Sequence, residues 1–107
     1  MTTFDRREEG FEAKFAHDEA EKFKAEARRN RLLGLWVAKQ LDLSGEAAND
    51  YARTVVAAEF GAGRDADVVA KVLADLGAKG IAITEAEIQV KMDELMAQAI
   101  AQVKAGV

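Results

Sequence analysis

The distribution of bulky hydrophobic residues divides this chain into two unlike parts. Residues 1–31 contain no Leu, Ile or Val, whereas aliphatic residues recur from Leu32 to Val107. A charged segment without aliphatics has little to bury against itself, so it tends to stay open until a partner supplies the other half of a core. The same segment holds four of the five phenylalanines, Phe4, Phe11, Phe15 and Phe23. Because aromatics at helical spacing suit a groove on another protein, we expect a folded body that carries a binding arm.

Composition narrows the class of protein. A chain of 107 residues is long enough for one domain with a modest core, and the dominance of alanine, leucine, lysine and glutamate favours an all-α fold. The net charge of −4 argues against a nucleic-acid binder, and the absence of cysteine excludes disulfides and thiolate metal sites. The start, MTTFDRREE, lacks the apolar stretch of a secretory signal, and no run approaches membrane-spanning length. We therefore expect a cytoplasmic protein without membrane insertion.

Short breaks divide the sequence into four predicted helices, at about residues 18–41, 45–60, 65–79 and 84–104. Four helices joined by such short loops predict a four-helix bundle with mostly antiparallel neighbours. The bundle domain would span residues 18–107, and residues 1–17 would form a flexible or frayed N-terminal arm. The predicted N-terminal signals are Asp18 with Glu21, Ser44, Asp65, and the capping box of Thr84 and Glu87 with its Ile83–Ile88 staple.

Hydrophobic spacing predicts which face of each helix is buried. Gly34, inside the first helix, is expected to allow a close helix crossing, with a kink as the alternative. The predicted inner residues are Val55, Val56 and Phe60 in the second helix, Val68, Val69, Val72, Leu73 and Leu76 in the third, and Ile88, Met92, Leu95, Met96, Ala99, Ile100 and Val103 in the fourth.

The arm and the first helix carry two apolar faces. On a continuous helix that advances about 100° per residue, Phe4, Phe11 and Phe15 fall within about 20° of one line. A second stripe, between about 100° and 160°, contains Ala16, Ala20, Phe23, Ala27, Gly34, Ala38 and Leu41. The second stripe continues into aliphatic sequence and is expected to pack on the bundle. The first stripe then needs another partner.

The alternative is that the arm folds back over the fourth helix or the end of the bundle, where its phenylalanines would be ordinary core. Against this, exposed apolar stripes are uncommon without a binding role. Gly10 costs a free helix about 1 kcal/mol relative to alanine, which suits a segment that becomes helical when it docks.

The residues that carry chemistry are few. The single histidine, His17, and the single serine, Ser44, suggest no catalytic set, and one histidine cannot supply a di-metal bundle site. We therefore expect no enzyme activity, metal or cofactor. The basic cluster Arg28, Arg29 and Arg31 could meet a phosphate or an acidic surface, with a solvated helix face as the alternative. This cluster supports a second hypothesis, a nucleotide-responsive or adapter helical binding module.

Several motifs resemble one known family. The stretches FEAKFAHDE (11–19), FKAEARRN (23–30) and LLGLW (32–36) are similar to the zeta family, small inhibitor subunits of the F-type ATP synthase in alphaproteobacteria. Further matches are YAR (51–53), DV (67–68), KV (71–72), DL (75–76), KG (79–80) and KMDEL (91–95). The glycine-rich run Gly61–Arg64 departs from the family, in which a more acidic loop would be expected.

The resemblance implies a four-helix bundle and a regulatory function. Its N-terminal segment would become a helix at a catalytic α/β interface of the synthase head, beside the rotor subunit γ, and block ATP hydrolysis. The protein would then be peripheral to the inner membrane through the synthase. The implied partner-binding residues lie between Thr2 and Phe23: Phe4, Arg6, Arg7, Glu8, Glu9, Phe11, Lys14, Phe15, His17 and Phe23.

Overall fold

A computed structural model describes residues 19–107 of the chain, which form four α-helices and no strand within that range. The helices are α2 (Glu19–Gln40), α3 (Gly45–Ala58), α4 (Asp65–Ala78) and α5 (Glu85–Ala105). The predicted all-α fold of four helices is confirmed, and α3 ends two residues earlier than predicted. No helix in the described part of the chain is both long and apolar enough to cross a membrane.

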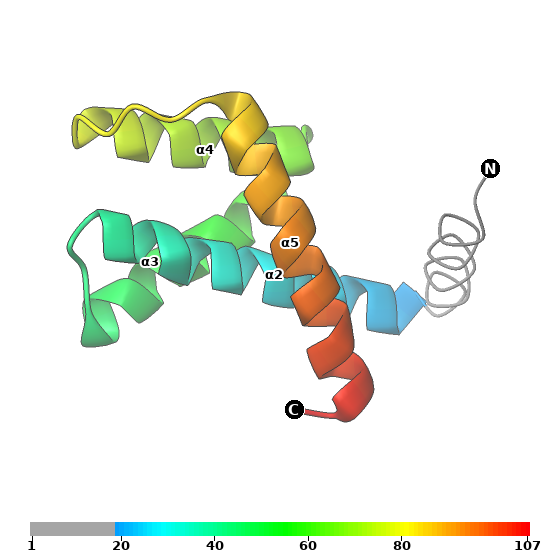
Figure 1. Ribbon diagram of the computed structural model, residues 1–107. Coiled ribbons are helices and arrows are strands. Elements are labelled where there is room, and N and C mark those ends of the chain that lie inside the picture. The colour runs from blue at the N-terminus through cyan, green and yellow to red at the C-terminus, as the bar shows by residue number, and fades with distance from the viewer. Residues whose placement is uncertain (1–18) are drawn as a thin grey trace.

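The helices pack around α2, which contacts each of the other three. In Figure 1, α3 returns in the direction opposite to α2, α4 reverses again, and α5 crosses α2 obliquely. The main core lies where these helices meet. Its buried residues are Leu33, Val37, Val55, Val68, Val69, Val72, Leu76, Ile88, Met92 and Leu95.

A second, smaller cluster joins the N-terminal half of α2 to the C-terminal half of α5. Ala25 and Ile100 are buried there, and Met96 and Val103 pack against them while remaining partly exposed. The predicted inner face of the last helix is therefore correct in position, although Met96 and Val103 are less buried than the other members.

The strongest predicted helix start is confirmed in detail. The side chain of Thr84 accepts a hydrogen bond from the Glu87 amide (3.1 Å), and Glu87 accepts one from the Thr84 amide (3.2 Å). This capping box satisfies amides that would otherwise lack partners at the start of α5. Ile88 is buried in the main core, and Ile83 packs against that core.

Two other predicted caps differ from the structure. Ser44 occupies the N-cap position of α3, but its side chain makes no capping hydrogen bond. Asp65 is the first residue of α4, and Arg64 holds the N-cap position instead. The carboxylate of Asp65 is not available as a cap because it accepts hydrogen bonds from Arg29.

The predicted second stripe is buried only in its C-terminal half. Gly34 and Ala38 are buried, but Ala20, Phe23 and Ala27 are exposed, because α5 packs on the face that carries Ala25 in this half of α2. Phe60, predicted as an inner residue of α3, is 86% exposed. Since α3 ends at Ala58, Phe60 no longer follows the helical period that predicted its burial.

Gly34 marks the closest approach of two helices. A Cβ atom at this position would lie 2.6 Å from the Ala52 Cα and 3.3 Å from the Val55 Cβ. A backbone atom cannot move aside as a flexible side chain can, so α2 and α3 require glycine here. The predicted close crossing at Gly34 is confirmed, and α2 runs through it as one helix.

We predict that Gly34→Ala destabilises the bundle. Overpacking costs about 1–3 kcal/mol, which exceeds the gain of at most about 1 kcal/mol in helix propensity. Gly77→Ala is the matched control, because an added Cβ at Gly77 in α4 would meet nothing within 4 Å. Urea unfolding followed by circular dichroism measures both changes. Equal stability of the two variants would contradict the packing role of Gly34.

Candidate functional site

Most of the predicted partner-binding residues lie outside the described part of the chain. These are Phe4, Arg6, Arg7, Glu8, Glu9, Phe11, Lys14, Phe15 and His17. Phe23 is described, and it lies in the second turn of α2 with 57% of its surface exposed. An exposed aromatic beside the start of the arm is the first feature of a candidate binding surface.

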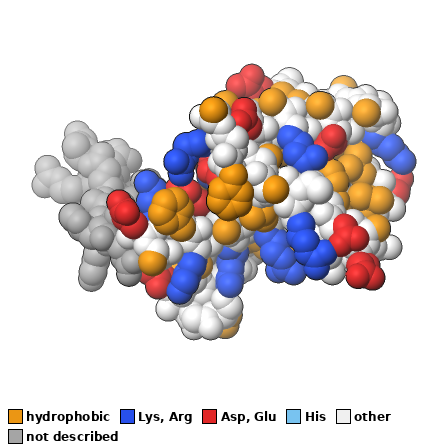
Figure 2. All heavy atoms as spheres, turned by 180° about the vertical axis from the view of Figure 1, so that it is seen from behind, with side chains coloured by type: hydrophobic (Ala, Val, Ile, Leu, Met, Phe, Trp, Pro, Cys, Tyr) orange, Lys and Arg blue, Asp and Glu red, His pale blue; other side chains and the backbone are white. Residues whose placement is uncertain are grey.

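Phe23 and Phe60 line the same apolar groove. It has a volume of about 510 Å³ and lies between the N-terminal half of α2, the end of α3 and the loop that follows α3. Ala27, Val56 and Gly61 complete its apolar walls. Figure 2 shows hydrophobic side chains exposed on this face among basic and acidic ones. Neither phenylalanine contributes to the core of the described body.

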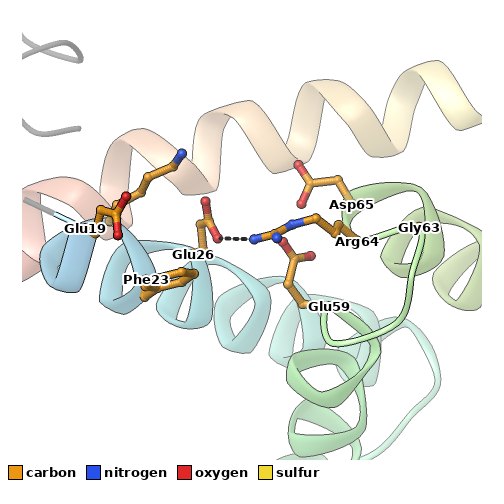
Figure 3. Close-up of a pocket in the computed structure, with 8 residues that line it drawn as sticks. Glu19, Phe23, Glu26, Glu59, Gly63, Arg64 and Asp65 are labelled. Atoms are coloured by element: carbon orange, nitrogen blue, oxygen red, sulfur yellow. Dashed lines mark ion pairs between the residues drawn. The ribbon is translucent and has the colours of Figure 1, made fainter. Parts of the chain in front are cut away.

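A more polar hollow adjoins the apolar groove and shares four of its residues: Phe23, Glu26, Glu59 and Arg64. Glu19, Lys22, Gly63 and Asp65 line the remainder. In Figure 3, Phe23 and Glu26 project from α2 on one side, while Glu59, Arg64 and Asp65 approach from the α3–α4 connection on the other. Arg64 Nη2 lies 3.8 Å from Glu26 Oε2, which joins the two sides.

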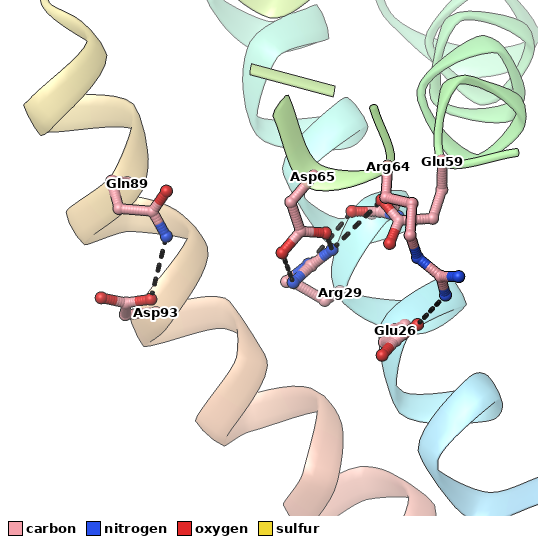
Figure 4. Close-up of polar contacts among 8 residues, drawn as sticks. Glu26, Arg29, Glu59, Arg64, Asp65, Gln89 and Asp93 are labelled. Atoms are coloured by element: carbon pink, nitrogen blue, oxygen red, sulfur yellow. Dashed lines mark hydrogen bonds and ion pairs between the residues drawn. The ribbon is translucent and has the colours of Figure 1, made fainter. Parts of the chain in front are cut away.

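A buried ion cluster lies beneath this surface. Arg29 of α2 donates hydrogen bonds to both carboxylate oxygens of Asp65, at 2.7 and 3.3 Å, and lies 3.6 Å from Glu59 Oε2. The Arg29 side chain is 5% exposed and that of Glu59 is 12% exposed, whereas Asp65 is about half exposed. Arg29 also donates from Nε to the amide oxygen of the buried Asn30 (3.1 Å). Figure 4 shows how Arg29 connects α2 to both ends of the α3–α4 loop.

The cluster holds one more carboxylate than cation, and this shifts its titration. Burial raises the pKa of Glu59 from 4.5 to about 7, and the neighbouring Asp65 adds to the rise against the opposing charge of Arg29. For Asp65, partial burial acts to raise the pKa, but the hydrogen bonds from Arg29 outweigh it and hold the pKa below 3.8. Near neutral pH, Glu59 therefore exists in both protonation states, while Asp65 is ionised.

The loop that carries Phe60 is held in a particular shape. Its glycines allow the Asp67 carboxylate to fold back, since a Cβ at Gly61 or Gly63 would lie 2.2 or 2.4 Å from an oxygen of that group. The Gly63 amide donates to Asp67 Oδ2 at 2.9 Å. Arg64 then adopts a positive φ of 51°, which is uncommon for a residue with a side chain.

The three arginines of the predicted basic cluster do not act as one surface. Arg29 is committed to Asp65 and Glu59 inside the protein, so it cannot meet an external phosphate with its neighbours. Arg28 donates to Gln102 (3.5 Å) and to the backbone oxygen of Val107. Arg31 is exposed and lines a hollow together with Arg28. The solvated-face alternative also fails for Arg29, which is 4% exposed.

Residues that complete the candidate site were not predicted from sequence. Phe60 was assigned to the core, and Glu59 and Arg64 were not singled out. A sequence signal was available for Phe60, because it directly precedes Gly61 and so lies where the helix period ends. Nothing in the local sequence pairs Glu59 with Arg29, which is 30 positions away.

Residues 19–107 form a small all-α body with an apolar groove on its surface. Within residues 19–107, no three His, Cys, Asp or Glu side chains gather to hold a metal ion. The chain belongs to the ATPase inhibitor subunit zeta family, because the sequence model of that family matches residues 1–102. The family to which the sequence motifs pointed is therefore confirmed, and with it a regulatory role as an inhibitor subunit.

A similar structure has been solved by solution NMR. It is 52% identical in sequence and superposes with a TM-score of 0.68, covering 80% of this chain and 98% of the other. This likeness supports the fold described above. No curated protein sequence matches the chain.

We predict that Arg29→Met destabilises the protein by about 1–3 kcal/mol, because it leaves the Glu59 carboxylate buried without its cation. Arg31→Met is the control, since exposed Arg31 should change stability by no more than about 0.5 kcal/mol. Denaturant unfolding of both variants measures the difference. A stability loss in Arg31→Met as large as that in Arg29→Met would contradict the structural role of the cluster.

We also predict a pH dependence of stability from Glu59. Between pH 4.5 and about 7 the folded protein holds a proton that the unfolded chain has released. The stabilisation from protonated Glu59 is therefore complete below pH 4.5 and is lost as the pH rises through about 7. The contribution of Asp65 has the opposite sign and is lost only as the pH falls below 3.8.

Melting temperatures measured from pH 5 to pH 8 check this prediction. The wild type should lose stability across this range, and Glu59→Gln should lose less because it cannot ionise. Glu94→Gln, at an exposed position on α5, is the control and should follow the wild type. Parallel curves for Glu59→Gln and the wild type would show that Glu59 does not titrate in this window.

Proposed function

We propose that this protein inhibits ATP hydrolysis by the F-type ATP synthase, and that its N-terminal segment is the inhibitory element. In this proposal, residues 1–17 fold into a helix at a catalytic interface between the α and β subunits of the synthase head, near the rotor subunit γ. Wedged there, the helix blocks rotation in the hydrolytic direction and hinders synthesis much less. The protein would be cytoplasmic and peripheral to the inner membrane through the synthase.

The observation that carries the proposal is the separation of aromatic from aliphatic residues along the chain. The core of residues 19–107 is built from aliphatic side chains and Met92, and Phe23 is left exposed at the base of the arm. Membership of an ATPase inhibitor family supplies the class of target. The Phe4–Phe11–Phe15 stripe then supplies apolar anchors that the described core does not require.

The energetics show why aromatics alone are insufficient. Burial of three phenylalanines contributes roughly 1.5–3 kcal/mol each, whereas ordering the backbone of the arm costs about 1–2 kcal/mol per residue. Helical hydrogen bonds and charge-assisted contacts from Arg6, Arg7, Glu8, Glu9 and Lys14 would contribute the remainder. Such an arm also binds more tightly when a folded body tethers it near its site, since tethering raises its effective concentration.

The geometry of α2 fits this role. α2 begins at Glu19, so a helical arm would extend it by about 1.5 Å per residue, or roughly 25 Å over the segment 1–17. The extended helix would carry the phenylalanine stripe away from the bundle, while α3, α4 and α5 would remain outside the cleft as a rigid stop.

The hypothesis of a nucleotide-responsive module has less support. It relied on the Arg28, Arg29 and Arg31 cluster, and Arg29 forms ion pairs within the protein. No other observation in the described residues favours it over the inhibitor role.

We predict that deletion of residues 1–17 leaves a folded bundle and abolishes inhibition. Circular dichroism and thermal melting check the fold, and ATP hydrolysis by the purified synthase head checks inhibition. In the full chain, Phe11→Ala and Phe15→Ala should each raise the half-inhibitory concentration about tenfold, which corresponds to the loss of about 1.4 kcal/mol.

Phe11→Leu is the matched control, because it keeps a large apolar side chain and should retain most of the inhibition. None of these variants should lose more stability than a weak surface contact supplies, about 1–2 kcal/mol. Full inhibition by the truncated chain would disprove the proposal. A loss of stability typical of a core phenylalanine, about 3–5 kcal/mol, in Phe11→Ala or Phe15→Ala would instead place these rings in the protein's own core.

A further inference from the structure

The groove between Phe23 and Phe60 has an unusual combination of walls and floor. Its walls are apolar, and Phe60 is the most exposed of the large hydrophobic side chains in residues 19–107. Its lining also includes the buried Asn30, whose amide oxygen accepts a hydrogen bond from Arg29 Nε. Glu59, also part of the lining, is ion-paired with Arg29 at 3.6 Å, so the polar groups beneath the groove are held within the protein.

An occupant with apolar side chains would cover the exposed rings of Phe23 and Phe60, and charged groups on it could meet Lys24, Glu26 and Arg64 of the lining. A polypeptide segment rich in aromatic residues has this chemistry. The groove therefore points to a peptide ligand.

We infer that this groove is the docking site of the chain's own N-terminal segment, residues 1–18, in the protein that is not bound to its target. The segment enters the body at Glu19, and Glu19 lines the hollow that adjoins the groove. Phe15 precedes Glu19 by four residues, so an extended connection of about 13–14 Å is available to it. Phe11, eight residues away, can reach about twice as far.

The composition of the segment matches the groove. The segment has phenylalanines and no Leu, Ile or Val, so it cannot build a core of its own. Aromatic pairs contribute about 0.5–1.5 kcal/mol beyond the area that they bury, which favours Phe11 or Phe15 against Phe23 and Phe60. The lining carries charges of both signs, Lys24, Glu26 and Arg64, and the segment is itself a mixture of acids and bases.

The covalent connection favours this occupant over a second copy of the chain. A short tether gives an effective concentration in the millimolar range, so a contact too weak to join two molecules still holds within one. The groove presents only a few apolar residues, which is little for a stable interface between two chains.

Docking of the segment would also regulate the protein. This consequence rests on the proposed function, because a segment held in the groove is not free to enter the ATPase. Its apparent affinity falls by the fraction of molecules in which it is free. If nine in ten molecules hold the segment docked, release from the groove raises the inhibitory potency about tenfold.

The experiment uses the full chain without any ATPase. Because the chain has no cysteine, Glu8→Cys provides one attachment site for a nitroxide spin label. We expect paramagnetic broadening of the amide resonances of Val56, Gly61 and Arg64 in dilute ¹⁵N-labelled protein. Adding Phe60→Ala should remove most of this broadening, whereas the control Val90→Ala, at an exposed apolar site on α5, should not.

The alternative occupants give different results. A second sample mixes spin-labelled chains that carry no ¹⁵N with ¹⁵N-labelled chains that carry no spin label. Broadening in this mixed sample would assign the groove to a second copy of the chain and overturn the inference. Absence of broadening at the groove would also overturn it. Neither result bears on the proposed inhibition, which is measured separately by the deletion of residues 1–17.

Inhibition by Phe60→Ala supplies the regulatory test. Release of the segment should make this variant a stronger inhibitor than the wild type, by a factor of about two to ten. Weaker inhibition by Phe60→Ala would show that the groove contacts the ATPase directly. That outcome would overturn docking of the segment and leave the proposed function intact.

Discussion

The guanidinium of Arg29 reaches from the middle of α2 to two carboxylates that flank the α3–α4 loop, Glu59 on one side and Asp65 on the other. One buried cation thereby sets the position of the end of α3, the start of α4 and the loop between them. Phe60 and Arg64 belong to that loop, so the groove exists because the cluster holds the loop against α2. A buried ion pair is a weak source of net stability, but it specifies a single arrangement when its partners come from different elements. The groove lined by Phe23 and Phe60 therefore depends on the arrangement that Arg29 specifies.

The elements of the fold were largely predictable because they follow local rules. Thr84 and Glu87 form a capping box within four residues, and the apolar period of α4 and α5 identifies their buried faces without knowledge of any partner. Gly34 was predictable as a crossing point, since a glycine inside a strong helix needs a packing reason. The family motifs extended this prediction to the class of protein.

The site was predictable only in part, because it arises from contacts between distant segments. Asp65 looks like an N-cap in sequence, and only the approach of Arg29 diverts its carboxylate to another role. Arg29 looks like one member of a basic face, and only the fold shows that it points inward. Ala27 and Phe23 continue an apolar stripe, yet both are exposed, because α3 ends at Ala58 and α5 packs on Ala25 instead. Periodicity identifies an apolar face, but it does not determine where the neighbouring helix ends.

The exposure of Phe23 and Phe60 has a consequence for how an inhibitory arm could be controlled. A deep, enclosed groove would bind the arm strongly and compete too well with any target. Because Phe60 is 86% exposed, this shallow groove can bury only part of each aromatic ring of the arm and so binds the arm weakly. Weak docking suffices within one chain, since the tether supplies the concentration. It also leaves the segment free in a fraction of molecules, from which a tighter foreign cleft can capture it. Glu59, whose pKa is raised to about 7, belongs to the lining of the same groove. A change in the charge of Glu59 would therefore alter both the α3–α4 loop and the surface that the segment contacts. The ion cluster that shapes the fold is thereby placed to adjust how readily the arm is released.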